Sequence, residues 1–122
     1  MKSSKIKFIT EELEKEFENI DDSDFLKKSI KRALEDLKAN VFCGVQIPKR
    51  LFPLKYIEKY SITNLWKYDL PKGWRLIYTI TAEDEVKIVC AILEWFNHKI
   101  MRRDSNINMF LYILFLPFSI CL

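Results

Sequence analysis

The sequence has few of the residues that break secondary structure, form cross-links or bind metals. Its 122 residues include two glycines, four prolines, three cysteines and one histidine. So few glycines and prolines predict few turns and long regular elements. The cysteines are odd in number and widely spaced, with no CxxC pair, which argues against structural zinc and for a reducing, cytosolic setting. We expect no metal and no other cofactor.

The chain also lacks the long apolar runs that insert into membranes. The N-terminus, MKSSKIKFITEELEKEF, has charges where a signal peptide has its apolar stretch, so we expect no secretion. The apolar run at the other end, 109–122, is interrupted by Pro117 and has 14 residues, whereas a spanning helix needs roughly 20. We therefore predict a cytoplasmic protein without stable membrane insertion. A membrane-surface anchor formed by this run remains the alternative.

Apolar residues make up 49% of the chain and charged residues 30%, which predicts one folded domain. The charge is unevenly distributed. Residues 1–41 hold nine basic and ten acidic side chains, 42–81 hold seven and two, and 82–122 hold four and five. The positive excess in the middle third predicts attraction of a polyanion. A solvated lysine-rich loop would give the same count.

Two amphipathic helices are predicted in the first third. Thr10 is a candidate N-cap, and the following residues 11–20 begin with acids and place apolar side chains on one helical face. A second helix over roughly 23–41 has a longer apolar stripe, and Gly44 is its expected C-terminal stop. The next stretch, 44–63, contains two prolines, so only LKYIEKY is expected to form a turn or two of helix.

Basic and aromatic residues are interleaved between positions 49 and 60. Lysine and arginine could contact phosphates while the rings stack on bases. The rings could equally be core residues with the basic side chains at the rim.

A β-hairpin is predicted for LWKYDLPKGWRLIYTI, residues 65–80. Both arms alternate with a period of two around Pro71, Lys72 and Gly73. If Leu70 faces Trp74, then Asp69 faces Arg75 and Lys67 faces Ile77. One face would then be apolar, with Trp66, Tyr68, Leu70, Trp74, Leu76, Tyr78 and Ile80.

A turn at AEDE, 82–85, leads to a further β-branched strand, VKIVCAILEW. We therefore predict an α+β domain in which two N-terminal helices pack on one face of a three- to four-stranded antiparallel sheet, with KIKFIT as the optional strand. The opposite face would be bare and would display Lys67, Asp69 and Arg75, where Asp69 and Arg75 form a cross-strand ion pair. A phosphodiester substrate would explain the clustered cations.

The hairpin motifs LWKYDL and GWRLIY, after two helices and before a last strand and a histidine, resemble the RelE/ParE superfamily of small bacterial and archaeal toxins. The resemblance covers roughly residues 8–103. It implies a RelE-like fold and a metal-independent endoribonuclease that acts on messenger RNA in the ribosome. It also implies neutralisation by a cognate antitoxin. The superfamily contains non-catalytic gyrase poisons as well, so a binding protein or inactive remnant is the alternative.

The resemblance also implies residue roles. Lys67 would orient or activate the ribose 2′-hydroxyl, Arg75 would stabilise the phosphate, and His98 would transfer a proton. Products would carry 2′,3′-cyclic phosphate and 5′-hydroxyl ends. Asp69 stands where relatives have a second lysine, and Glu94 is a lower-ranked candidate base. The expected RNA-binding residues are Lys49, Arg50, Lys55, Lys72 and Lys99.

The C-terminus departs from the resemblance, so we divide the chain into a toxin-like domain, 1–103, and an atypical hydrophobic tail, 104–122. Relatives continue after the histidine with a tyrosine-bearing, basic ending. With AT-rich codons, IMRRDSNINMF reads in another frame as YEKRFKYKYV. We hypothesise that one lost nucleotide shifted the frame just after Lys99. The nucleotide sequence of the gene tests this hypothesis.

Overall fold

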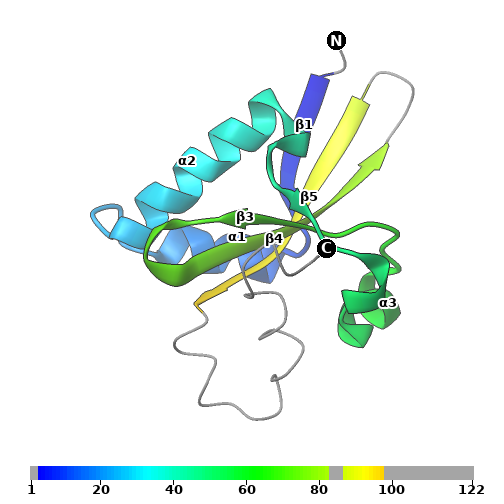
Figure 1. Cartoon of the computed structure of the whole chain (residues 1–122). Helices are drawn as coiled ribbons and strands as arrows, with labels where there is room; N and C mark the ends of the chain where they lie inside the picture. The colour runs from blue at the N-terminus through cyan, green and yellow to red at the C-terminus, as the bar shows by residue number, and fades with distance from the viewer. Residues whose placement is uncertain (1–2, 83–86, 98–122) are drawn as a thin grey trace.

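The fold is that of a computed structural model, which describes residues 3–82 and 87–97. Within these ranges the chain forms an α+β domain (Figure 1), which confirms the predicted class. The helices are α1 (Glu11–Asn19), α2 (Phe25–Ala39) and α3 (Leu54–Tyr60). The strands are β1 (Ser3–Phe8), β2 (Val45–Gln46), β3 (Trp66–Asp69), β4 (Trp74–Ala82) and β5 (Lys87–Asn97).

All five strands belong to one mixed sheet with the order β1-β5-β4-β3-β2. β1 runs parallel to β5, whereas the other neighbours are antiparallel. The prediction of three or four antiparallel strands is therefore wrong, although KIKFIT does contribute a strand. The sequence could not predict β2, because its two residues are too few to show an alternating pattern. It could not predict the direction of β1 either, because parallel and antiparallel strands have the same alternation.

Helix α1 begins where its capping residue predicts. The backbone N–H of Leu13 donates to the Thr10 hydroxyl at 3.1 Å, which satisfies one of the amides that have no partner within the helix. Glutamates occupy its first turn, where the helix dipole favours negative charge. Helix α1 ends one residue before the predicted boundary.

Helix α2 is shorter than predicted at both ends. The Asp24 carboxylate accepts a hydrogen bond from the backbone N–H of Leu26 at 2.8 Å and so caps the start. Asn40 caps the end, and a short 3-10 helix, Val41–Cys43, follows it. The Asn40 side chain accepts from the N–H of Phe42 at 3.0 Å. Val41 of the 3-10 helix is buried in the same core as Ala33 and Leu37, so the apolar pattern continues past residue 39.

The expectation that Gly44 stops this helix is wrong. Its φ of −80° is open to any residue, and it lies beyond the 3-10 helix. A Cβ at this position would lie 2.4 Å from the hydroxyl oxygen of Tyr78 and 2.5 Å from the carbonyl oxygen of Lys67. The close approach of the Tyr78 hydroxyl and the Lys67 backbone therefore requires glycine at this position.

The hairpin has the predicted register. Asp69 pairs with Arg75, Lys67 pairs with Ile77, and the backbone N–H of Leu70 donates to the Trp74 carbonyl at 2.8 Å. The turn, Pro71–Gly73, has two consecutive residues in the left-handed region, Lys72 at φ 61° and Gly73 at φ 84°. Of the second expected turn, 82–85, Ala82 is the last residue of β4, and 83–85 lie outside the described residues.

One face of the sheet packs against α1 and α2, as the alternation predicts. Ile30, Ala33 and Leu37 of α2 form a core with sheet residues such as Tyr78 and Ile92. The partly buried residues around this core include Leu13 and Phe17 of α1, Ile6 and Phe8 of β1, and Trp66, Tyr68, Trp74, Ile80 and Trp95 of the sheet. The two N-terminal helices thus cover this face.

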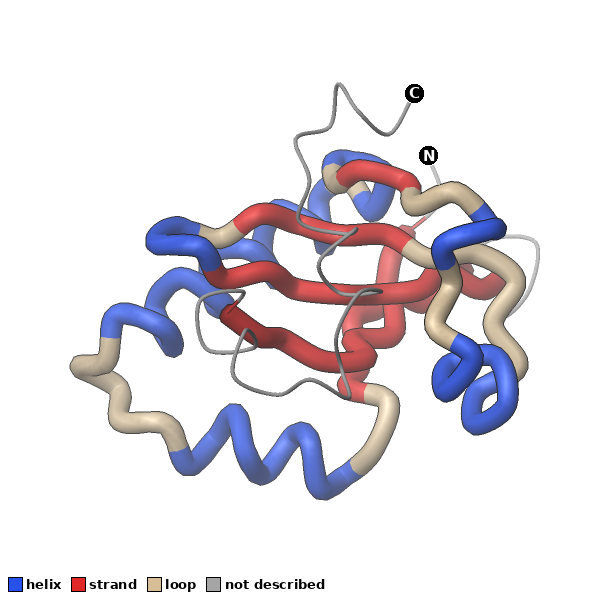
Figure 2. The backbone as a smooth tube through the Cα atoms, turned by 60° about the horizontal axis from the view of Figure 1, so that its bottom comes forward, coloured by secondary structure: helices blue, strands red, loops and turns tan. Residues whose placement is uncertain are grey.

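The opposite face is not bare, so that part of the prediction is wrong. Residues of this face form a second core with the segment that the two prolines interrupt, which includes α3 (Figure 2). Its buried members are Ile47, Phe52, Tyr56, Leu65, Ile77, Leu93 and Phe96. The aromatic residues Phe52 and Tyr56 are therefore core residues, the structural alternative left open by the sequence.

Candidate functional site

The candidate site lies on the face of the sheet that α3 partly covers. Lys67 pairs with Ile77, and Ile77 pairs with Glu94 on its other side. Paired residues project from the same face, so Lys67 and Glu94 flank Ile77 there. Arg75, two positions from Ile77 on β4, projects from this face as well. Three of the charged residues singled out in the sequence therefore surround one buried isoleucine, which we call the Ile77 cluster.

Lys67 is brought to this cluster but is not displayed on the surface, contrary to the prediction. It is 4% exposed, and Ile77 beside it is fully buried. The period-two pattern predicts which face a side chain occupies, but it does not report what covers that face. A buried ammonium has a stronger electrostatic effect on its neighbours than an exposed one, because the surroundings screen it less than water does.

Arg75 forms the predicted cross-strand ion pair. Its Nε lies 2.8 Å from Oδ1 of Asp69, and the Arg75 side chain is 15% exposed. The Asp69 side chain is 58% exposed, so solvent screens this pair on one side. Any phosphate that binds Arg75 must compete with the Asp69 carboxylate.

Glu94 is held from α3. The Tyr56 hydroxyl donates to Oε1 of Glu94, and Nζ of Lys55 lies 3.3 Å from the same oxygen. Burial, and after it the charge of Glu94, raises the pKa of Tyr56, so its hydroxyl stays protonated and acts as a donor. Among the described residues, Oε2 of Glu94 accepts no hydrogen bond. This carboxylate therefore has one fixed oxygen and one available oxygen.

The expected RNA-binding residues do not form one patch. Lys49 and Arg50 are exposed in a 3-10 helix, Lys49–Leu51, before α3. Lys55 is paired with Glu94. Lys72 lies at the hairpin turn, where its Nζ is 4.2 Å from the ring centre of Phe25 at the start of α2. Lys72 is therefore directed toward the helices rather than toward the Ile77 cluster.

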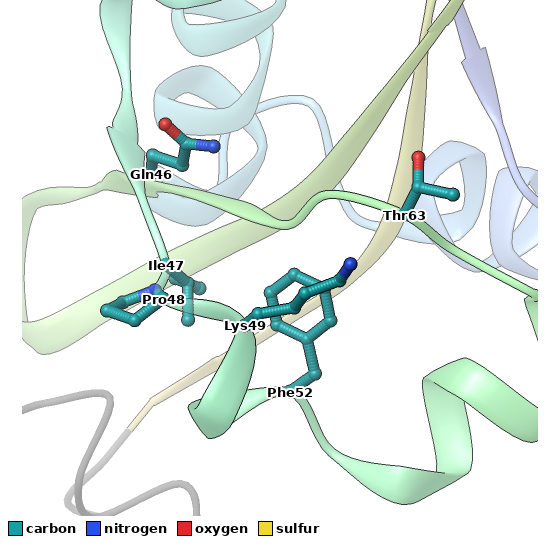
Figure 3. A pocket seen from close by; sticks show the side chains of 6 residues that line it. All are labelled: Gln46, Ile47, Pro48, Lys49, Phe52 and Thr63. Atoms are coloured by element: carbon teal, nitrogen blue, oxygen red, sulfur yellow. The ribbon is translucent and has the colours of Figure 1, made fainter.

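Lys49 lines a hollow of about 310 Å³ beside the second core (Figure 3). Buried Phe52 and Ile47 contribute its apolar wall, and Gln46 and Thr63 lie on opposite sides in the view. The hollow is open and combines one cation with two neutral polar side chains. It holds no carboxylate or histidine among the lining residues that the structure describes.

Two cations that were not singled out in the sequence lie on the same face as the cluster. Lys5 and Lys7 of β1 pair with Val89 and Ala91 of β5, and both lysines are exposed. Thr79, two positions from Ile77, is paired with Ala91, which assigns Lys7 to the face of the cluster. The alternation in KIKF was the available signal, but it could not reveal which strand β1 would join.

His98 and Lys99 lie outside the described residues, so the predicted role of His98 has no structural counterpart here. Within 3–82 and 87–97, no three His, Cys, Asp or Glu side chains come together as a metal site would need. No helix in these ranges is both long and apolar enough to cross a bilayer. Glu94 was the lower-ranked candidate base in the sequence analysis. In the structure, it is the candidate catalytic residue whose side-chain contacts are best defined.

No protein-family model, curated protein or solved structure matches the chain. The chemistry of the candidate site therefore has to be argued from its residues.

Proposed function

We propose that the protein is a metal-independent endoribonuclease toxin that cleaves messenger RNA, acts on the ribosome and is neutralised by a cognate antitoxin. The observation that carries the proposal is the Ile77 cluster, with two cations and one carboxylate on one sheet face. Cleavage by transesterification needs a base for the ribose 2′-hydroxyl and positive charge for the phosphate oxygens. The resemblance of the hairpin to RelE/ParE toxins supports the same reaction.

In this proposal Arg75 binds the phosphate at which the chain is cut. Guanidinium groups bind phosphate oxygens through paired hydrogen bonds and stabilise the charge that develops in the transition state. Lys67, which is buried, adds a weakly screened positive charge two strands from Glu94. The 2′-oxygen attacks phosphorus, which leaves a 2′,3′-cyclic phosphate and a 5′-hydroxyl end.

The RNA strand on either side would contact exposed cations. Lys5 and Lys7 lie toward one edge of this face, and Lys49 and Arg50 precede α3. Such contacts bind the backbone without regard to sequence and weaken as the salt concentration rises. We propose a cytoplasmic location, where translating ribosomes and an antitoxin are present.

The test is to add the purified full chain to translating ribosomes and map the RNA ends. We expect cuts that leave 2′,3′-cyclic phosphates and 5′-hydroxyl ends. Arg75→Ala should lower the cleavage rate by about 100-fold or more, as expected for loss of a group that stabilises transition-state charge. Arg32→Ala, an exposed arginine on α2, is the matched control and should cleave at the parent rate.

Cleavage that survives Arg75→Ala would remove this arginine from the mechanism. Absence of cleavage by the full chain has two explanations, and a version with the ending YEKRFKYKYV after Lys99 separates them. Activity that appears only in this version supports the frameshift hypothesis. Inactivity of both versions rejects the ribonuclease.

The second candidate function is a non-catalytic binding protein of the same superfamily, either gyrase-directed or an inactive remnant. Two observations favour it, namely the 4% exposure of Lys67 and the pairing of Arg75 with Asp69. It predicts partner binding that Arg75→Ala weakens, without any new RNA ends. A neighbouring gene for a small antitoxin would support both toxin functions, and its absence would favour the remnant.

A further inference from the structure

We propose that Glu94 is the general base of the cleavage reaction and that Tyr56 and Lys55 are its positioning residues. The inference rests on the proposed ribonuclease function. It moves the role of activating the 2′-hydroxyl from Lys67 to a carboxylate at the other side of Ile77.

Exposure distinguishes the two candidates for the base. The Glu94 side chain is 27% exposed, whereas Lys67 is 4% exposed. A general base must come within hydrogen-bond distance of the hydroxyl that it deprotonates. Substrate can meet this condition at Glu94 with less rearrangement than at Lys67. A carboxylate is also ready to accept a proton at neutral pH, whereas a lysine ammonium must first lose one.

Tyr56 and Lys55 fix the carboxylate. Both contact Oε1, and they come from consecutive positions on α3, so the helix holds them together. With Oε1 occupied, Oε2 remains as the proton acceptor. Tyr56 is buried in the second core, which limits the freedom of its ring. Orientation of a base by a buried hydrogen-bond donor is a recurrent feature of catalytic sites.

Arg75 lies diagonally from Glu94 across the β4–β5 pair, since Glu94 faces Ile77 and Phe96 faces Arg75. Diagonal neighbours on one face are about 7–8 Å apart at the backbone, and their side chains can converge further. A 2′-oxygen and the phosphorus that it attacks lie about 3–3.5 Å apart in a reactive geometry, so the two side chains must converge to serve one nucleotide.

The step is balanced without another reactant. Oε2 of Glu94 takes the proton from the 2′-hydroxyl while the 2′-oxygen bonds to phosphorus. The bond between phosphorus and the 5′-oxygen breaks, and the leaving oxygen keeps the electron pair and takes a proton from water. Glu94 then releases its proton to solvent.

The charged and titratable groups that face Glu94 come from three elements. They are Tyr56 and Lys55 on α3, Lys67 on β3, and Arg75, paired with Asp69, on β4. Glu94→Gln removes only the carboxylate and leaves these neighbouring groups in place, so an acid-side loss of rate that this variant abolishes is assigned to Glu94.

The test is the pH dependence of the single-turnover rate at which the full chain cuts a short messenger RNA, with one cleavage site, that is bound to ribosomes. Glu94→Gln keeps the shape and should lower the rate by about 100-fold or more while removing the acid-side fall. Glu58→Gln, an exposed residue on α3, is the matched control and should keep both. Tyr56→Phe should shift the acid-side fall to higher pH, because the charged carboxylate loses a hydrogen-bond donor. Urea unfolding of each variant checks that it folds.

The role of Glu94 and the ribonuclease function can be rejected separately. Cleavage by Glu94→Gln at the parent rate, with the acid-side fall retained, overturns the role of Glu94 while the ribonuclease stands. No cleavage by either the parent chain or the version with the ending YEKRFKYKYV overturns both. An unchanged profile in Tyr56→Phe, alongside an inactive Glu94→Gln, overturns the positioning role of Tyr56 alone.

Discussion

Lys27 joins the end of α1 to the start of α2, and replacing it by methionine tests how the helical layer is held. The Lys27 side chain is 9% exposed although it carries a charge. Its ammonium donates to the carbonyl oxygen of Glu18 at 3.0 Å and lies 2.8 Å from Asp22. It also lies 5.4 Å from the ring centre of Phe17. Helix α1 has no basic residue of its own in its last turn, and Lys27 comes from α2.

Lys27→Met keeps the aliphatic stem and removes the charge. A hydrogen bond from a charged donor contributes about 1.5–3 kcal/mol, and a cation–π contact about 0.5–2 kcal/mol, more when it is desolvated. The pair with Asp22 adds little, because the Asp22 side chain is 81% exposed. Burying methionine in place of an ammonium offsets part of the loss. We expect the free energy of unfolding to fall by about 2 kcal/mol.

Urea unfolding followed by tryptophan fluorescence measures this change. With a slope of about 1.5 kcal/mol/M, the midpoint should fall by more than about 1 M. Lys28→Met is the matched control, since Lys28 is exposed on the next position of the same helix. Its expected effect is within about 0.5 kcal/mol. Equal midpoints for the two variants would refute the reasoning that the Lys27 ammonium links the helices.

Three further changes test other parts of the fold. Gly44→Ala should lower stability by about 1–3 kcal/mol, because its Cβ would lie 2.4 Å from the Tyr78 hydroxyl, and a calorimetric melting temperature equal to that of the parent would contradict the clash. Tyr78→Phe should cost about 1–3 kcal/mol in chemical unfolding, because it leaves the buried carbonyl of Val41 and the N–H of Gly44 without this partner. The Lys27 hydrogen bond holds the pKa of Asp22 below 3.8, so its stabilising contribution is present above that pH and is lost as the pH falls below it. Asp22→Asn should therefore lose less stability than the parent between pH 5 and 2.5, and equal losses would count against the pairing.

The hairpin could be predicted in detail because its information is local. Pro71, Lys72 and Gly73 locate the turn, and the period of two on either side then determines each cross-strand pair. The same reasoning identified the face that α1 and α2 cover. The predicted helix ends were less accurate, because the Asn40 side chain accepts a further hydrogen bond beyond the last turn of α2.

The candidate site was predicted only in part, because its decisive contacts are between distant segments. Lys67 and Arg75 were assigned to one face correctly, but the burial of Lys67 depends on residues that no local pattern connects to it. Tyr56 lies 38 positions from Glu94, and its segment contains two prolines that obscure any period. Nothing in the sequence around Tyr56 or Glu94 indicates that these two side chains form a hydrogen bond.

The parallel pairing of β1 with β5 has a consequence for how the chain folds. Ser3 opens the first strand, yet its partner Lys87 is among the last of the described residues. During synthesis on a ribosome, β1 therefore emerges early, and its backbone hydrogen-bonding groups stay unpaired until β5 has been synthesised. Such non-local contacts slow folding, and the waiting strand can meet other nascent chains meanwhile. A permuted gene that begins at β5 and continues into β1 would shorten that wait.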